Sequence, residues 1–254
     1  MCAVSSIFLL TYSFAAEEQR EPMSQKWGFT GLFGKFDRSS LQRGFQVYSE
    51  VCSACHSLNY LAYRNLGEKG GPEFSLEQVK AIAAQFEIED GPNEDGEMYM
   101  RNAVPSDSFV NPWPNEQAGR LANGGAYPPD LSVIIKARKN GANYVYSLLT
   151  GYDEVPPSDF ELGENMYYNP YMSGQRIAML KVLEDDLIEY FDGTEATLEQ
   201  MSYDVTNFLA WAAEPKLEQR KSLGFQVMAY IIILAALLYF INRRLVSYTH
   251  LRAH

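Results

Sequence analysis

The sequence predicts a mostly α-helical head with long irregular loops, followed by a single C-terminal transmembrane helix. Apolar residues recur at helical spacing around 41–55, 76–86 and 197–213. The intervening stretches are rich in Pro, Gly and Asn, which is typical of irregular structure. Near the end, residues 223–241 form an apolar run in which only Gln226 is strongly polar. The chain has 254 residues, 46% of them hydrophobic, which is enough for a packed core.

The formal net charge is −11. This acidic balance argues against nucleic acid as a partner. It favours a basic partner, because opposite fields speed the encounter of two proteins.

Residues 1–16 form a short apolar run that ends in small residues, before the charged pair Glu17 and Glu18. This pattern predicts a signal peptide cleaved near Ala15 or Ala16. The usual basic residues before the run are missing, which leaves open that the start is clipped. An ordinary buried strand or helix is the alternative. We expect residues 17–222 to form the exported head.

A first helix is predicted after Asp37, which supplies N-cap chemistry. Its apolar face continues through Tyr48 into Cys52, Cys55 and His56. Two Cys three residues apart with a His directly after them form the c-type haem attachment pattern. On one helix these three positions share a face, so both thiols can bond to one porphyrin while the imidazole reaches the iron. Bacteria attach haem in this way outside the cytoplasm, which agrees with export.

Three other interpretations of the two Cys are a disulfide, a redox pair and half of a zinc site. A zinc site needs four ligands. The predicted head holds no further Cys or His, since Cys2 lies in the predicted signal peptide and His250 and His254 follow the apolar run. One covalently attached haem c is therefore the favoured cofactor.

A capping box of Ser75 and Gln78 predicts a second helix over 76–86. The stretch 87–97 then carries six acids and no base. It is either a solvated acidic loop or a docking surface for a basic electron carrier.

Residues 104–129 and 151–171 predict long irregular segments, and such loops are often functional. Short helices are predicted over 130–138 and 143–150. The amphipathic helix 197–213 is expected to pack against the first helix.

The apolar run is roughly 28 Å long as a helix, close to the thickness of a bilayer core. We assign 223–242 to the membrane anchor and 243–254 to a tail. Basic residues flank the run on both sides, so charge counting alone does not orient it. The haem orients the run, because a head with attached haem must lie outside the cytoplasm and the tail must then lie on the inner side of the membrane.

The second axial ligand of the iron is expected to be a Met, because no second His lies on the same side of the membrane. A His/Met pair raises the haem potential. Spacing alone does not choose among five candidates. These are Met98, Met100, Met166, Met172 and Met179.

Several further stretches of the chain are typical of one family of haem proteins. They are Arg43-Gly-Phe-Gln-Val-Tyr, Asp90-Gly-Pro-Asn-Glu-Asp-Gly-Glu-Met, Ala126-Tyr-Pro-Pro-Asp-Leu-Ser, Tyr144-Val-Tyr-Ser-Leu-Leu-Thr-Gly-Tyr, Tyr168-Asn-Pro-Tyr and Trp211-Ala-Ala-Glu-Pro. Through them nearly the whole mature chain resembles the cytochrome c1 family, the haem-bearing subunit of the cytochrome bc1 complex.

The resemblance implies that Met179 is the second axial ligand. Family members often have Gly-Met-Ala-Pro-Pro, whereas here Ala178 precedes Met179 and Leu180 follows it. Met172 stands where an aromatic residue is common in the family and is therefore a rival ligand. The resemblance also implies a set of residues that line the haem pocket, the last two of them near the propionates. These residues are Asn123, Ala126, Pro128, Pro129, Leu131, Ile134, Arg138 and Tyr144.

The function implied is a membrane-anchored electron carrier, not an enzyme on its own. It would take single electrons from a Rieske iron–sulfur subunit and pass them to a basic cytochrome c during ubiquinol oxidation, in a dimeric complex that includes cytochrome b. Two alternatives are a haem enzyme of the peroxidase or nitrite-reducing type and an anchored cytochrome of another chain or a terminal oxidase. The expected location is the bacterial inner membrane with the head in the periplasm and the C-terminus in the cytoplasm; the mitochondrial inner membrane, with the head in the intermembrane space, is the alternative.

Overall fold

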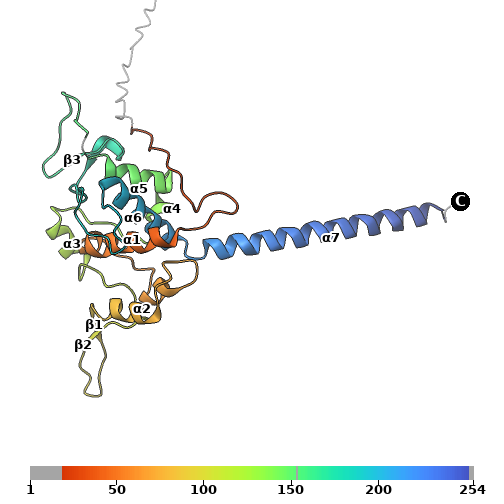
Figure 1. Ribbon diagram of the computed structural model, residues 1–254, viewed down its shortest axis with the longest axis horizontal. Coiled ribbons are helices and arrows are strands. Elements are labelled where there is room, and N and C mark those ends of the chain that lie inside the picture. Colours follow the sequence, from red (N-terminus) through yellow and green to blue (C-terminus); the bar gives the residue numbers. More distant parts are fainter. Residues whose placement is uncertain (1–18, 153, 252–254) are drawn as a thin grey trace, which may run out of the picture.

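The computed structural model describes residues 19–152 and 154–251, and these form a mostly helical head from which one long helix extends (Figure 1). The α-helices are α1 (Arg38–Glu50), α2 (Leu76–Ala83), α3 (Glu116–Ala122), α4 (Ile134–Ala137), α5 (Gly141–Thr150), α6 (Leu198–Ala213) and α7 (Leu217–Leu251). Short 3-10 helices are η1 (Cys52–Ala54), η2 (Tyr63–Gly67) and η3 (Ser173–Gln175). The fold class is confirmed. The expected signal peptide, residues 1–16, lies outside the described residues.

Two small antiparallel pairs complete the regular structure of the described residues. Strand β1 (Glu87–Asp90) pairs with β2 (Tyr99–Asn102), and β3 (Tyr167–Tyr168) pairs with β4 (Arg176–Ile177). The rest of the described head is loop.

Helices α1 and α6 form the centre of the head and pack against each other, as expected. The Asp37 carboxylate accepts a hydrogen bond from the Ser39 N–H and so caps α1. Thr197 caps α6 in the same way. A Cβ atom at Gly44 would lie 2.0 Å from the carbonyl oxygen of Asp204, so only glycine permits this approach of the two helices.

Aromatic rings fill the space next to this helix pair. The Phe208 ring of α6 lies 5.7 Å from Phe45 and 5.8 Å from Tyr48, both on α1. Met201 and Trp211 of α6 are fully buried in the same core. This core fixes the C-terminal end of α1, from which the Cys and His residues follow.

The first helix is shorter than expected. It ends at Glu50, and the Cys residues continue in the separate 3-10 turn η1. The Ser53 hydroxyl donates to the carbonyl of Ser49 at 2.7 Å, and the tighter backbone of a 3-10 turn is common at helix ends. One continuous helix through Cys55 was therefore a wrong prediction.

Other boundaries also differ from the expected ones. The helix expected over 130–138 is only α4, and α3 lies within the stretch 104–129 that was expected to be irregular. The amide oxygen of the Asn115 side chain caps α3 by accepting a hydrogen bond from the Ala118 N–H. Helix α5 agrees with its prediction.

The acidic stretch 87–97 is a β-hairpin with an exposed tip. A basic residue is supplied by the partner strand β2, where the Arg101 guanidinium forms ion pairs with Asp90 and Asp107. The acidic stretch has no basic residue of its own, but in the structure it is paired with a strand that carries one.

Helix α7 leaves the head as a long stalk (Figure 1). Within it, Leu217–Leu245 contains an 18-residue window that has a mean hydropathy of 2.2 and no buried residue, so by length and composition this part can cross a membrane. The helix begins six residues before the apolar run because Arg38 of α1 holds its first turn through two hydrogen bonds to the Glu218 carboxylate, each of 2.8 Å.

Candidate haem site

The turn that carries the two Cys and the His is closed by its own backbone. The N–H groups of Cys55 and His56 both donate to the carbonyl oxygen of Cys52, at 3.1 and 2.9 Å. These bonds keep the three residues within one turn although the α-helix has ended. A 3-10 turn therefore takes the place of the shared α-helical face that the sequence predicts.

The His56 ring is held by a second segment of the chain. Its Nδ1 lies 2.8 Å from the carbonyl oxygen of Pro129, and a carbonyl can only accept, so Nδ1 carries the proton. The other ring nitrogen, Nε2, is then unprotonated and able to bind a metal. Burial lowers the pKa of His56, with a smaller opposing effect from the Pro129 carbonyl and Asp130, so the ring is neutral at pH 7.

Both Cys are free thiols in the described structure, which does not support the disulfide alternative. Burial of the thiol raises the pKa of Cys52 to about 12, although the residue as a whole is only half-buried. Reactive redox cysteines need a lowered pKa. Cys52 is thus a poor redox thiol. Within the residues that the structure describes, no group of three or more His, Cys, Asp or Glu is arranged to hold a metal ion.

The segment after Pro129 is tied to the residues that follow His56. The Asp130 carboxylate accepts from the Ser57 hydroxyl and from the Asn59 N–H, both at 2.8 Å. The Leu131 N–H donates to the carbonyl of Ser57 at 2.9 Å. Burial would raise the pKa of Asp130, but these bonds and those from Ser132 outweigh it and lower the pKa. Asp130 is therefore ionised and fixes Pro129 opposite His56.

The remaining residues expected to line the pocket lie in several places. Leu131, Ile134 and Tyr144 are buried, and Ala126 donates its N–H to the carbonyl of Asn123 at the end of α3. Arg138 is exposed, and its guanidinium donates to the carbonyl of Ala137 at 3.3 Å. The structure thus brings Pro129 and, through the Ser57 bond, Leu131 next to His56, and leaves Arg138 at the surface.

Of the five candidate methionines, Met172 and Met179 differ in which of their atoms accepts a hydrogen bond. The Tyr144 hydroxyl donates to the Met172 sulfur at 3.4 Å. Met179 is held through its backbone, because the Tyr152 hydroxyl donates to its carbonyl at 3.0 Å. Among the described contacts the Met179 thioether has no hydrogen bond and is free to act as a ligand. Met98, Met100 and Met166 are exposed.

Three supporting residues have no signal in the sequence. The Trp113 indole donates to the carbonyl of Cys55 at 3.2 Å, and the Tyr48 hydroxyl donates to the carbonyl of His56 at 3.0 Å. Tyr152 supports Met179 in the same manner. All three donate to backbone carbonyls, which every residue possesses, so no motif could reveal them.

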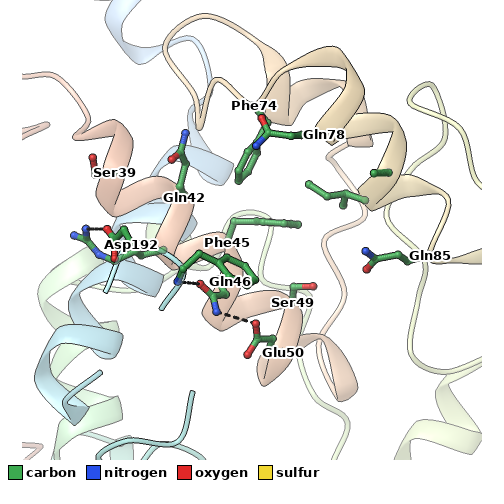
Figure 2. A pocket seen from close by; sticks show the side chains of 14 residues that line it. Ser39, Gln42, Phe45, Gln46, Ser49, Glu50, Phe74, Gln78, Gln85 and Asp192 are labelled. Carbon is green, nitrogen blue, oxygen red and sulfur yellow. Dashed lines mark hydrogen bonds and ion pairs between the residues drawn. The ribbon is translucent and has the colours of Figure 1, made fainter. Parts of the chain in front are cut away.

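A separate cleft of about 510 Å³ lies between α1 and α2 (Figure 2). In it Gln46 donates to the Glu50 carboxylate at 2.9 Å. None of the residues expected to hold or line the haem borders this cleft. It is distinct from the candidate haem site.

The donor set fits a covalently bound haem. Two unpaired thiols and a neutral imidazole with a free Nε2 lie in one turn, and an uncommitted thioether lies further along the chain. This is the combination that thioether attachment and axial ligation require.

Comparison with known proteins agrees with this chemistry. The model of the cytochrome C1 family matches residues 27–249. The chain is 46% identical to "Cytochrome b/c1" of Bradyrhizobium diazoefficiens, over 98% of the chain and 39% of that protein. It is 49% identical to a mitochondrial "Cytochrome c1-2, heme protein" of Solanum tuberosum, over 91% of the chain and 86% of that protein. For "Cytochrome c1, heme protein, mitochondrial" of Saccharomyces cerevisiae the identity is 48%, over 88% and 70%. The chain therefore spans less than half of the Bradyrhizobium protein and most of the two mitochondrial ones.

Proposed function

The chain belongs to the cytochrome c1 family, the haem subunit of the bc1 complex, and from this premise we propose that it carries one haem c covalently attached through Cys52 and Cys55. His56 and Met179 are the proposed axial ligands, which leaves no axial position for a substrate. The observation that carries the proposal is the single turn in which two free thiols stand beside a His whose Nδ1 is bonded to Pro129.

When bound, the haem supplies a one-electron iron couple. The chain's own residues hold and shield it. Pro129 fixes the tautomer of His56, Tyr48 fixes its backbone, and Trp113 fixes the backbone of Cys55. Leu131, Ile134 and Tyr144 are proposed to keep water from the buried side of the pocket, and Arg138 to meet a propionate, for which its exposed guanidinium is suited.

We propose that the head accepts electrons from a Rieske iron–sulfur subunit and gives them to a basic cytochrome c, within a dimeric complex that contains cytochrome b. The Candida albicans relative is named "Cytochrome b-c1 complex catalytic subunit, mitochondrial", which supports membership of such a complex. The proposed orientation has the head outside the cell membrane or in the intermembrane space, and the tail after α7 on the opposite side.

Covalent attachment gives a direct test. The haem is expected to stay with the chain in a denaturing gel, because thioether bonds survive unfolding. The double variant Cys52→Ala/Cys55→Ala should lose the pigment from the denatured chain. Gentle solubilisation of the membranes should also retain iron–sulfur and cytochrome b subunits, with ubiquinol-dependent reduction of cytochrome c. Pigment released from the denatured wild-type chain, or tight carbon monoxide binding by the native head, would contradict the proposal.

The acidic hairpin is the proposed docking surface for the basic acceptor. Glu94, Asp95 and Glu97 lie at its exposed tip. Neutralising them to Gln, Asn and Gln should slow electron transfer to cytochrome c by about 3- to 10-fold at low ionic strength and flatten its salt dependence, because charge steering is lost. Stopped-flow measurements over a range of salt concentrations provide the check.

A matched control removes the same charge elsewhere. Asp159, Glu161 and Glu164 lie in the exposed loop before β3. If their triple neutralisation changes the rate and its salt dependence as much as the hairpin variant does, the effect belongs to overall charge and the hairpin is not the docking surface.

A further inference from the structure

The head contacts the first turns of α7 through Arg38 of α1 and through the loop of residues 28–35. We propose that residues 28–35, here named the foot loop, rest in the lipid surface, with Leu32 and Phe33 inserted beside the first turn of the membrane span. The inference rests on the membrane anchor of the proposed function but concerns a part of the head that no electron-transfer step requires.

The foot loop presents two adjacent large apolar side chains to solvent. Leu32 is 70% exposed and Phe33 is 75% exposed. Both are held outward at the same tip of the loop. Adjacent exposed apolar side chains of this size mark an interaction surface more often than single ones do.

The position of the tip relative to the span is given by a ring contact. The Phe33 ring lies 6.3 Å from the ring of Phe225 on α7. The apolar run of α7 begins at Leu223, so Phe225 lies about 3 Å along the helix from its start. When the run crosses a bilayer, Phe33 lies at the depth of its first turn. A shallow groove of about 270 Å³ separates the foot loop from the helix and has Leu32, Phe33 and Phe225 in its lining.

The foot loop is a fixed structure at this depth. The Lys221 ammonium of α7 donates to the carbonyl oxygens of Phe29 at 2.7 Å, Gly31 at 2.6 Å and Gly34 at 3.3 Å. A Cβ atom at Gly34 would lie 1.9 Å from the Thr30 carbonyl oxygen, so the turn requires glycine. The helix that carries Lys221 is itself joined to α1 by Arg38 and Glu218.

The chemistry of the tip fits a lipid surface. Aromatic and aliphatic side chains are favoured at the boundary between headgroups and acyl chains. Lys35, at the end of the same loop, is exposed and can meet lipid phosphates. Continuity with the span favours lipid as the occupant over a protein partner, because the bilayer is present wherever the span is.

Spin labelling of the full-length, haem-loaded chain in lipid nanodiscs tests the inference. Single cysteines replace Phe33, Leu32, Ile232 or Val155 in a Cys2→Ser background, in which Cys52 and Cys55 are bonded to haem. Ile232 lies within the span, and Val155 is 88% exposed in the loop that leads from α5 to β3. Strand β3 lies on the side of the head away from α7 (Figure 1). Power saturation then compares access of the label to oxygen, which enriches in lipid, and to a water-soluble nickel chelate.

Labels at Phe33→Cys and Leu32→Cys are expected to respond more to oxygen than to nickel, as the Ile232→Cys label does, while Val155→Cys responds in the opposite sense. A foot loop label that behaves like Val155→Cys, with Ile232→Cys still in lipid, overturns the inference and leaves the anchor intact. An Ile232→Cys label in water removes the anchor itself. Shielding of Phe33→Cys only when other subunits are added would assign the tip to a protein partner and also overturn the inference.

Discussion

Replacing Met179 by Leu is expected to lower the haem potential by roughly 0.1–0.4 V, because the identity of the axial ligands moves haem potentials over a range of about 0.8 V. The low-spin spectrum should weaken at the same time, since Leu offers no ligand to the iron. Redox titration of the haem-loaded protein, with optical spectra at each potential, measures both effects.

Met172→Leu is the matched control, since it makes the same exchange seven residues earlier in the chain. The Met172 sulfur accepts a hydrogen bond from Tyr144, whereas among the described residues none donates to the Met179 sulfur, and Tyr152 donates to the Met179 carbonyl. The control should leave both the potential and the spectrum nearly unchanged. If Met172→Leu lowers the potential and Met179→Leu does not, the ligand assignment must be exchanged.

The sequence was sufficient for those parts of the fold that depend on local chemistry. The caps of α1 and α2 are Asp37 and Ser75, whose side chains accept hydrogen bonds from N–H groups in the first turn of each helix. Helix α7 follows from an apolar run long enough to cross a bilayer. In each case the decisive interaction lies within a few residues of the element itself.

Elements that depend on distant partners were missed or misplaced. The helix expected over 130–138 lost its first turn because the Asp130 carboxylate binds Ser57 and Asn59, more than seventy residues away. The acidic hairpin depends on pairing with β2 and on Arg101. Neither partner can be identified from local spacing.

The same division holds at the candidate site. Cys52, Cys55 and His56 are recognisable because the attachment chemistry needs those side chains at that spacing. The groups that orient them are the carbonyl of Pro129 and the donors Tyr48 and Trp113. A carbonyl oxygen belongs to every residue, so its role appears only once the chain has folded.

The contact between α1 and α6 contains a charge that cannot be left unpaired. The side chain of Asp204 is fully buried and accepts from Arg43 Nε at 2.8 Å and from the Ser40 hydroxyl at 2.6 Å. Arg43 also donates to Asp192 at 2.9 Å, and this hydrogen bond is the main reason that the pKa of Asp192 is lowered to about 2. Asp192 in the folded protein thus binds its proton at a lower pH than in the unfolded chain, so its contribution to stability is present above pH 4 or so and is lost as the pH falls toward 2.

Arg43→Ala is therefore expected to destabilise the head by about 3–5 kcal/mol, because it removes the cation beside the buried Asp204 carboxylate and leaves it only neutral donors such as Ser40 and Gln200. Urea unfolding of the haem-loaded protein in detergent, followed by tryptophan fluorescence, measures the change. The control is Arg120→Ala, which breaks the exposed ion pair of Arg120 with Glu116 on α3 and should cost less than about 0.5 kcal/mol. Equal losses in the two variants would mean that the buried pair adds nothing beyond a surface contact. Arg43→Ala should also lose less stability than the wild-type chain on acidification between pH 4 and 2, because Asp192 no longer has the partner that lowers its pKa.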